Sequence, residues 1–221
     1  MVMLSRSPEC IPEWTWHATS NHTVQIKEKL FENILAPIAF LLLMLPVVSI
    51  IWGVHTNTLG ANPPETILRI TGDWALRILV MGLMISPIRR LLDWPQLLSL
   101  RRMFGLFTFY YTSLHFICYF WFDLSFVLEF LIEDVIDRPF ITFGFAAFVL
   151  LIPLVMTSTR AQMRQLGKIW GLIHLLVYPT VIFSVLHFWL LVKSDTTEPL
   201  IYAVIVTLLF LERIWWRIRG T

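Results

Sequence analysis

Long apolar stretches separated by shorter polar segments make up the sequence from about residue 30 onwards. About 20 apolar residues are enough for a helix to cross the hydrocarbon core of a bilayer, and shorter stretches are tolerated. The pattern therefore predicts an all-α integral membrane protein that forms a bundle of six transmembrane helices. The predicted spans cover residues 31–53, 73–88, 103–122, 140–156, 169–192 and 200–216.

The segment before the first span is polar and carries both acidic and basic residues. It has no compact apolar run followed by a small-residue cleavage site, so we do not interpret it as a signal peptide. We divide the chain into a polar tail, residues 1–29, and a transmembrane domain, residues 30–221. Between the first two spans, residues 54–72 are predicted to form a loop, because the run from Gly60 to Pro64 is typical of turns.

Charged residues differ in sign between the two ends of the predicted helices. Arginine and lysine concentrate between the second and third spans, between the fourth and fifth, and after the sixth. Acidic residues concentrate between the third and fourth spans. Because lysine and arginine gather on the cytoplasmic side of membrane proteins, both termini are predicted to be cytoplasmic.

The composition agrees with a membrane protein. Hydrophobic residues make up 57% of the chain and charged residues only 14%, whereas about a quarter of an ordinary soluble domain is charged. The formal net charge is +2, so binding to nucleic acid has no electrostatic support. Cys10 in the tail and Cys118 in the third span form no metal-binding motif and are not expected to pair.

Three histidines lie inside predicted spans: His115 in the third, and His174 and His187 in the fifth. An ionisable side chain is costly in a bilayer and usually faces the interior of a bundle, where it has a function. Imidazole is a common axial ligand of haem iron, so the three histidines predict haem binding. A single histidine in a span can instead form a hydrogen bond between helices.

The depths of the histidines suggest how they pair. The third and fifth spans run in the same direction, from the cytoplasm outwards. At ~1.5 Å per residue, His115 and His187 both fall in the outer half of the membrane, and His174 lies roughly 20 Å from His187, near the cytoplasmic face. We therefore predict that His115 and His187 hold one haem b and that His174 serves a second, inner haem.

The inner haem needs a partner for His174 on the third span. The residue at the matching depth is Arg101, which lies within roughly 40° of the face that carries His115. An always-charged guanidinium is a poor iron ligand, so Arg101 either holds a haem propionate or leaves the iron five-coordinate. On a regular helix His174 and His187 would lie about 140° apart, and we expect Pro179 between them to kink or rewind the helix.

Arg69 and Arg77, near the outer end of the second span, leave two interpretations open. They can bind haem propionates on the outer side, or Arg77 can form an ordinary ion pair with Asp73, four residues earlier. We recognise no internal repeat between the two halves of the domain. We also find no glycine-rich dinucleotide fingerprint, so the chain is expected to need a separate electron donor and acceptor.

Several short motifs resemble those of the MsrQ (YedZ) family, whose members are haem-binding membrane subunits of periplasmic protein-methionine-sulfoxide reductase systems. That family belongs to the ferric-reductase-like transmembrane group, and the resemblance covers residues 30–216. The motifs that carry it are Leu59-Gly60-Ala61-Asn62-Pro63, Thr71-Gly72, Ser86-Pro87, Arg101-Arg102 followed by Gly105 and His115, Thr157-Ser158-Thr159, Leu166-Gly167-Lys168, Trp170, His174 and Tyr178.

The resemblance implies an electron-transfer subunit, rather than a catalytic one, in the bacterial inner membrane. Such a subunit takes electrons from the respiratory quinone pool or a flavin donor and passes them through haem b to MsrP, a soluble periplasmic molybdopterin subunit that reduces methionine sulfoxide in oxidised proteins. The resemblance carries over His115, His174 and His187 as haem ligands and Arg101 as the arginine that replaces a histidine of larger relatives. FMN is also associated with the family, but we recognise no motif that binds it.

The sequence departs from the family pattern in two places, and other functions stay open. The tail is longer than the pattern leads us to expect, and Asp73 stands at a position that is basic in the pattern. One alternative is a stand-alone quinol-linked b-type cytochrome or ferric reductase, which would work without a protein partner. Another is a proton-coupled transporter, in which the histidines would relay protons.

Overall fold

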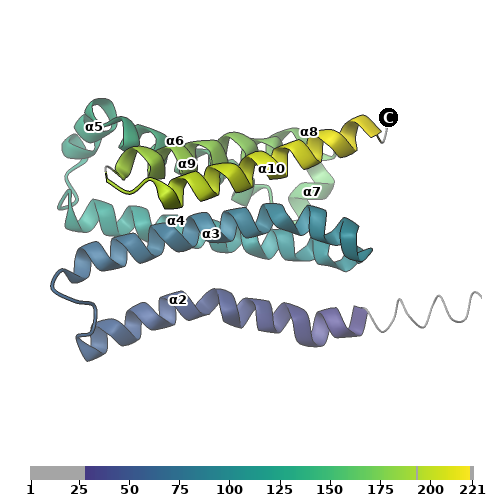
Figure 1. Cartoon of the computed structure of the whole chain (residues 1–221), viewed down its shortest axis with the longest axis horizontal. Helices are drawn as coiled ribbons and strands as arrows, with labels where there is room; N and C mark the ends of the chain where they lie inside the picture. Colours follow the sequence, from purple (N-terminus) through teal and green to yellow (C-terminus); the bar gives the residue numbers. More distant parts are fainter. Residues whose placement is uncertain (1–27, 193, 220–221) are drawn as a thin grey trace, which may run out of the picture.

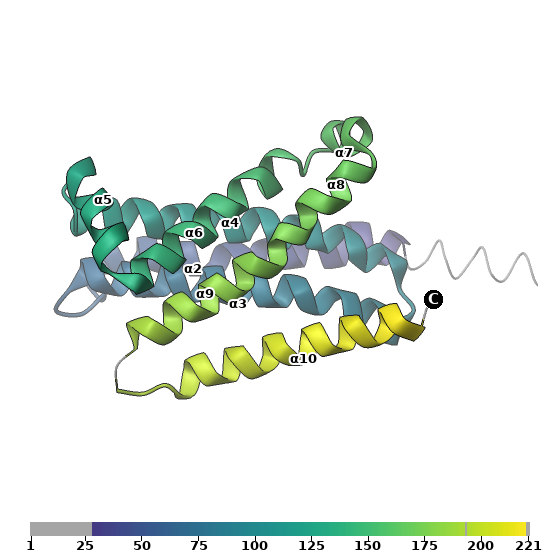
Figure 2. The same ribbon diagram turned by 90° about the horizontal axis from the view of Figure 1, so that it is seen from above.

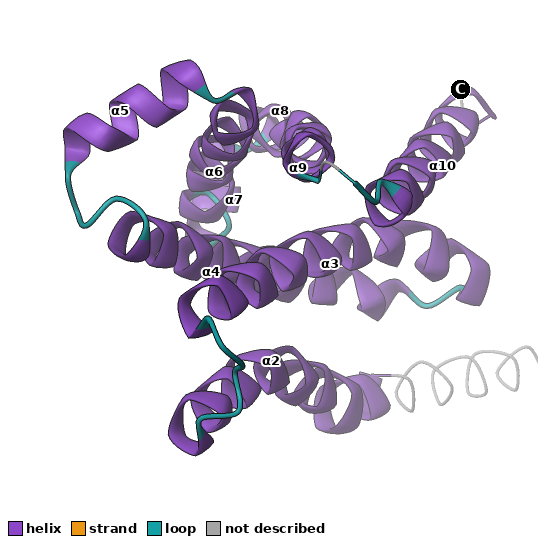
Figure 3. Ribbon diagram, turned by 60° about the vertical axis from the view of Figure 1, so that its left-hand side comes forward, coloured by secondary structure: helices purple, strands orange, loops and turns teal. Residues whose placement is uncertain are grey.

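Helices are the only regular elements in residues 28–192 and 194–219, which are the residues that the computed structural model describes (Figures 1 and 3). The predicted all-α class is confirmed, and most of the predicted tail, residues 1–27, lies outside the described residues. In chain order the elements are η1 (Phe31–Leu35), α2 (Ala36–Thr56), α3 (Pro63–Leu92), η2 (Pro95–Leu97), α4 (Leu98–Phe122), α5 (Leu128–Asp137), α6 (Pro139–Met156), α7 (Arg160–Leu166), α8 (Lys168–Ile173), η3 (His174–Leu176), α9 (Val177–Leu191) and α10 (Thr197–Arg219).

Four helical runs among the described residues are long and apolar enough to cross a membrane: Glu28–Thr56, Pro139–Met156, Lys168–Leu191 and Thr197–Arg219. They coincide with the first, fourth, fifth and sixth predicted spans. The second and third predicted spans correspond to α3 and α4, which are not among these four. The full count of six spans therefore stays a prediction.

The prediction of a loop over residues 54–72 is wrong, because most of this segment is helical and α3 already begins at Pro63. Proline is favoured in the first turn of a helix, since its fixed φ suits the helix and its missing N–H has no partner there. The prolines that indicated a turn thus start a helix of 30 residues. The additional turns carry Leu68 and Gly72, which contact a histidine described below.

Two short helices lie in connections for which the sequence predicts no helix. α5 joins α4 to α6 at one end of the molecule, and α7 joins α6 to α8 at the other end (Figures 1 and 2). The first described helix begins, and α10 ends, at the end that carries α7 (Figure 1). Both ends of the described chain thus lie on one side, and the assignment of this side to the cytoplasm stays a prediction.

Four helices, α3, α4, α6 and α9, form the centre of the bundle (Figure 3). α3 packs along α4, α6 packs along α9, and the two pairs meet where α4 contacts α6 and α3 contacts α9. α2 lies against α3 and α4, and α10 lies against α3 and α9. α3 contributes to all three clusters of buried apolar side chains, so it is the helix on which the packing of the others depends.

A buried tyrosine joins α2 to this centre. Tyr111 of α4 is 0% exposed. Its hydroxyl donates to the backbone oxygen of Leu43 at 2.8 Å and accepts from the backbone N–H of Val47 at 3.2 Å. These two backbone groups would pair with each other in a regular α-helix, so the hydroxyl is inserted into the hydrogen-bond ladder of α2. Such an insertion is a known cause of helix bending.

We expect Tyr111→Phe to loosen α2 from the bundle, because the hydroxyl that links two backbone groups is lost. The expected cost is roughly 1–2 kcal/mol, measured as a lower midpoint when protein in detergent is heated and the remaining monodisperse fraction is quantified. Tyr110→Phe is the matched control, since Tyr110 is 38% exposed. Equal shifts in the two variants would contradict the role assigned to the Tyr111 hydroxyl.

Candidate functional site

His115 of α4 and His187 of α9 lie against each other in the half of the bundle nearer to α5. Their ring centres are 6.1 Å apart, and the ring planes are nearly perpendicular, at 82°. Both side chains are half-buried. The structure therefore brings together the two histidines that the sequence places at one depth, whereas their role as iron ligands stays a prediction.

Each of these histidines is held by a backbone carbonyl of a neighbouring helix. Nδ1 of His115 lies 2.9 Å from the oxygen of Leu68 in α3, and Nδ1 of His187 lies 2.6 Å from the oxygen of Phe140 in α6. A carbonyl oxygen only accepts hydrogen bonds, so Nδ1 carries the proton of the neutral ring and Nε2 keeps its lone pair. This is the usual arrangement of a histidine that binds a metal through Nε2.

A glycine makes room for each ring. A Cβ atom at Gly72 would lie 2.9 Å from Cε1 of His115, and a Cβ atom at Gly144 would lie 2.7 Å from Nδ1 of His187. Atoms do not approach this closely without a shift, so any larger residue would push the imidazole away. Each glycine lies four positions after the residue whose carbonyl holds the ring. The ring thus rests on a helix turn that only glycine leaves open.

The α3–α4 pair and the α6–α9 pair show the same arrangement of histidine and carbonyl. In both pairs, 47 residues separate the histidine from the residue whose carbonyl holds it. The prediction that the chain has no internal repeat is therefore wrong. Few residue types are identical between the two halves, which explains why the repeat is inconspicuous in the sequence. At one constant interval, Leu68, Gly72, Thr108, Thr112 and His115 recur as Phe140, Gly144, Thr180, Ser184 and His187.

The two threonines of this repeat are fully buried, with Thr108 1% and Thr180 0% exposed. Each hydroxyl donates to the carbonyl four residues earlier in its own helix, at 2.9 Å and 2.7 Å. The hydroxyls are therefore satisfied locally and leave no polar group unpaired in the interior. Small side chains at these positions allow the helices to approach closely, which places the histidines within reach of the carbonyls.

The separation of the two rings fits a site in which both imidazoles would hold one metal ion. An imidazole nitrogen binds a transition metal at about 2 Å, which places the centres of two opposed rings roughly 6 Å apart. The observed separation is 6.1 Å. Histidine is the common protein ligand of haem iron, so His115 and His187 fit the cofactor that the sequence predicts.

His174 lies at a break in the fifth predicted span. Residues His174 to Leu176 form a 3₁₀ turn between α8 and α9. Pro179 explains the break, because it has no N–H and its ring crowds the carbonyl of the residue four positions earlier, Leu175. The rewinding predicted for Pro179 is therefore observed, although the altered turn lies a few residues before the proline.

The structure places His174 apart from the other two histidines. Its ring stacks on Trp170, with ring centres 4.0 Å apart. Its Nδ1 lies 3.2 Å from the backbone oxygen of Trp170, which again leaves Nε2 with its lone pair. His174 thus has the tautomer of a metal ligand, but the described contacts include no second ligand beside it.

Arg101 lies near the start of α4, roughly 21 Å along the helix before His115. It lines a cavity of about 550 Å³ between α3, α4, α9 and α10. Leu175, the neighbour of His174, lines the same cavity. Arg101 and the neighbour of His174 therefore line one cavity, whereas His174 itself is not among the lining residues. The polar side chains that line this cavity are Ser86, Arg90, Arg101, Tyr178, Arg213 and Arg217.

The two arginines in the first half of α3, Arg69 and Arg77, have partners within the protein. Arg77 forms the ion pair with Asp73, at 3.6 Å, and donates to the hydroxyl of Tyr202 in α10 at 3.3 Å. Arg69 pairs with Glu65 at 3.3 Å, and both side chains are largely exposed. Arg77 therefore helps to join α3 to α10, and the binding of haem propionates by Arg69 and Arg77 stays a prediction.

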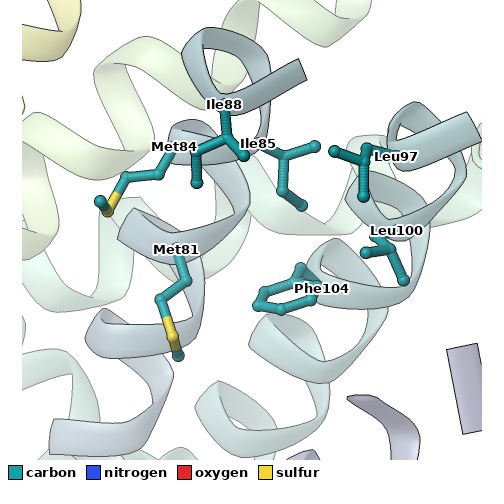
Figure 4. A pocket seen from close by; sticks show the side chains of 7 residues that line it. All are labelled: Met81, Met84, Ile85, Ile88, Leu97, Leu100 and Phe104. Atoms are coloured by element: carbon teal, nitrogen blue, oxygen red, sulfur yellow. The ribbon is translucent and has the colours of Figure 1, made fainter. Parts of the chain in front are cut away.

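An apolar groove of about 270 Å³ lies between α3, η2 and α4, at the end of the bundle that carries Arg101. Figure 4 shows the side chains that line it: Met81, Met84, Ile85, Ile88, Leu97, Leu100 and Phe104. None of these seven side chains can form a strong hydrogen bond. The groove can therefore accept a hydrocarbon chain, whereas a polar head group would have to be held elsewhere.

Known proteins identify the family. The sequence model described as "Ferric reductase like transmembrane component" matches residues 71–194. The protein-methionine-sulfoxide reductase heme-binding subunit MsrQ of Herminiimonas arsenicoxydans is 44% identical over 91% of this chain and 90% of its own length. The proteins of the same description from Xanthomonas campestris pv. campestris and Bordetella parapertussis are 47% and 44% identical, over 74% and 83% of this chain and 75% and 91% of their own lengths. The chain belongs to the MsrQ family.

Membership of the MsrQ family confirms the resemblance that the short motifs indicated. The ferric-reductase-like match runs from Thr71, directly before Gly72, to a point just after α9, so it contains both histidine–glycine contacts. No solved structure matches this MsrQ chain.

Sequence reasoning missed the two glycines as parts of the site. Gly72 counted only as part of a motif, and Gly144 was not considered. The signal that could have found them is the equal spacing of a glycine from a histidine in both halves of the chain. That spacing becomes informative only when the helices are known to pack in corresponding pairs.

We expect Gly72→Ala and Gly144→Ala to displace the imidazoles of this MsrQ chain, because each added methyl group would lie within 3 Å of a ring atom. If the rings hold haem, both variants should lose most of the low-spin absorbance in reduced-minus-oxidised spectra. Gly105→Ala is the matched control, since a Cβ atom at Gly105 meets nothing within 4 Å. Normal spectra in both ring-contacting variants would show that the close approach is not needed.

Proposed function

We propose that this chain is a haem b subunit of the bacterial inner membrane that transfers electrons to a periplasmic molybdopterin reductase of the MsrP type. The electrons come from the respiratory quinone pool or from a flavin donor, and the recipient reduces methionine sulfoxide in oxidised proteins. The relatives are named as heme-binding subunits of a protein-methionine-sulfoxide reductase. The observation that carries the proposal is the opposed pair His115 and His187, with both Nδ1 atoms bound to carbonyls.

In this proposal the chain fixes its ligands before any cofactor binds. His115 and His187 bind iron through Nε2, and the carbonyls of Leu68 and Phe140 keep the rings oriented. A bound haem supplies reversible one-electron chemistry. Reduction of one sulfoxide consumes two electrons and two protons, so the subunit must deliver two electrons in succession. The carbonyls of Leu68 and Phe140 would keep both rings in place. Neither ring would then have to move between the first and the second electron transfer.

We also propose a second, inner haem that is served by His174 and Arg101. A 3₁₀ residue rises ~2.0 Å and turns ~120°, against ~1.5 Å and ~100° in an α-helix. With three residues in the turn, His174 lies roughly 21 Å before His187, and Arg101 lies roughly 21 Å before His115.

The turn also reduces the rotation between His174 and His187 from about 140° to about 80°. His174 and Arg101 therefore occupy similar positions in the two halves of the repeat. We assign His174 as an iron ligand and Arg101 as the partner of a haem propionate, because guanidinium binds carboxylates well and iron poorly.

The proposed topology has six spans with both termini in the cytoplasm. α3 and α4 lie in the centre of the bundle beside α6 and α9 (Figure 3), which supports their assignment as the remaining two spans. Arginines at the end that carries α7 support a cytoplasmic assignment for that end. On this side the apolar groove in Figure 4 suits the tail of a quinone, and we assign no site to FMN.

The internal repeat favours a second candidate function, a proton-coupled transporter. Transporters are often built from repeats, including parallel repeats that are related by an axis along the membrane normal. In this function His115 and His187 would relay protons. Their hydrogen bonds argue against it, because a relay histidine must exchange protons at both ring nitrogens, whereas Nδ1 is bound to a carbonyl in both residues.

The first test is the haem content of purified protein. We expect wild type to show a low-spin b-type spectrum, and His115→Ala and His187→Ala each to lose it, because removal of either ligand breaks the bis-histidine site. A pyridine haemochrome assay measures the remaining haem. His55→Ala is the control, since His55 is exposed near the end of α2. Wild type without haem, after expression with ample haem, would favour the transporter.

The same preparations separate the proposed function from a stand-alone reductase. Reduced wild type should pass electrons to an MsrP-type subunit, and His115→Ala should lower that rate at least a hundredfold. Ferric chelates should accept electrons slowly in the absence of the subunit. Rapid reduction of ferric chelates, with no transfer to the subunit, would identify the chain as a stand-alone reductase.

We expect His174→Ala to remove the inner haem and to leave the outer one intact, because the two sites are separated along α9. The haem-to-protein ratio should fall from about two to about one, while the low-spin signal that depends on His187 persists. Arg101→Ala should weaken the inner haem, and Arg102→Ala is its control, since Arg102 is the neighbouring arginine and is not among the residues that line the cavity. An unchanged ratio in His174→Ala would rule out His174 as a ligand.

A further inference from the structure

The cavity between α3, α4, α9 and α10 contains more than Arg101. Four arginine side chains line it, from three different helices: Arg90, Arg101, Arg213 and Arg217. Glu212 pairs with Arg90, and the two side chains are each about one quarter exposed. The volume of about 550 Å³ lies within the range of about 300–1,000 Å³ that is typical of small-molecule sites.

Arg213 is positioned without being neutralised. It donates to the hydroxyl of Tyr178 at 2.5 Å and to the hydroxyl of Ser86 at 2.7 Å, and its guanidinium lies 5.3 Å from the centre of the Tyr178 ring. These partners belong to α9 and α3, so Arg213 of α10 is fixed at the junction of three helices. Because both partners are neutral, its full positive charge remains available to a ligand.

Arg101 adds a second charge that lacks an acidic partner among the described residues. The other arginines that line the same cavity are Arg90, Arg213 and Arg217, all positive. Like charges at such positions repel each other, and the repulsion grows as water is excluded. The fold holds these groups together, so an anion that enters the cavity relieves the repulsion and is bound by several guanidinium groups at once.

The remaining lining shows which kind of anion fits. Leu175, Phe210, Ile214 and Trp216 give the cavity an apolar side, and Ile214 and Trp216 of α10 are 55% and 50% exposed. α10 is one of the four helices long and apolar enough to cross a membrane, so in a membrane-spanning α10 these exposed side chains would meet lipid. A ligand in this cavity would contact arginines at one end and apolar side chains at the other. An anionic lipid has the matching chemistry, because its head group is negatively charged and its acyl chains are apolar.

We propose that this cavity binds the phosphate group of an anionic glycerophospholipid, with the acyl chains along the lipid-facing side of α10. Guanidinium forms paired, charge-assisted hydrogen bonds with phosphate oxygens. Basic pockets between transmembrane helices on the cytoplasmic side are typical binding places for such head groups. The phosphate would be held by Arg213 and Arg217 of α10, which leaves Arg101 of α4 for the propionate of the proposed inner haem. The proposed outer haem is separate, because His115 and His187 lie in the opposite half of the bundle. A free phosphate ion offers the same chemistry, so the test includes it.

The test measures lipid binding to delipidated, full-length protein in detergent by native mass spectrometry. Wild type should bind cardiolipin and phosphatidylglycerol at least tenfold more tightly than phosphatidylcholine. The double variant Arg213→Gln/Arg217→Gln should lose this preference. Arg160→Gln/Arg164→Gln is the matched control, because it removes two exposed charges of α7 at the same end of the protein and should keep the preference.

Substitution of Arg213 could itself disturb the fold, because this residue joins three helices. Two further variants therefore separate a loss of binding from a loss of folding. Arg213→Lys keeps the charge but cannot form the paired contacts, and it should retain a preference reduced by roughly threefold to tenfold. Single Arg217→Gln leaves the contacts of Arg213 to Ser86 and Tyr178 in place and should weaken binding of anionic lipid severalfold. Size-exclusion profiles show which variants are folded.

The outcomes distinguish the sources of the phosphate. Competition of lipid binding by millimolar inorganic phosphate, together with equal binding of anionic and zwitterionic lipid, would identify a soluble phosphate ligand. Equal lipid preferences in the double variant and its control would overturn the proposal. A loss of haem in Arg213→Gln/Arg217→Gln without any change in lipid binding would also overturn it, because the arginines would then serve haem carboxylates. The His115 and His187 spectra report on the outer haem separately.

Discussion

The hydrogen bond between an imidazole Nδ1 and a helix carbonyl constrains much of the structure around it. A carbonyl inside a helix is already paired, so the ring can reach it only from the side and at close range. That approach needs a glycine one turn later, as at Gly72 and Gly144. It also needs neighbouring helices that pack closely, which buried threonines and alanines such as Thr108 and Ala147 permit. The composition of the bundle centre thus follows from the need to fix two rings.

The opposite half of the bundle is organised by charge. Arg90 pairs with Glu212, and Arg213 donates to Ser86 and Tyr178, so α10 is tied to α3 and α9 by polar contacts at one end of the bundle. The first half of α10 is tied to α3 by the hydrogen bond between Arg77 and Tyr202. Between these contacts the packing is apolar, with Leu79, Val181 and Val206 in one buried cluster. Polar contacts therefore fix the position of α10 near both of its ends. The middle of the helix adds buried apolar surface but no directional contact.

Hydrophobic pattern and charge were sufficient to predict the helical class, the positions of most long helices and the common depth of His115 and His187, because each depends on local composition and on the fixed rise of a helix. The start of α3 was not predictable in the same way, since Pro63 and Pro64 suit both a turn and a first helical turn. The glycines were missed because their role depends on a ring from another helix. A distortion of the helix near Pro179 was predictable from the proline itself. The exact place of the 3₁₀ turn was not, because the ring of Pro179 crowds the carbonyl four residues earlier and the distortion therefore lies before the proline.

The repeat of α3–α4 in α6–α9 is the pattern expected after duplication of a helical hairpin. A duplicated hairpin begins with two equal ends, and selection can then treat the ends differently. In this chain the end that carries His115 and His187 has the same residue at the corresponding position of both copies. The other end has diverged to Arg101 in one copy and His174 in the other. The two ends of the bundle centre therefore differ in chemistry, with a pair of histidines at one end and an arginine and a histidine at the other.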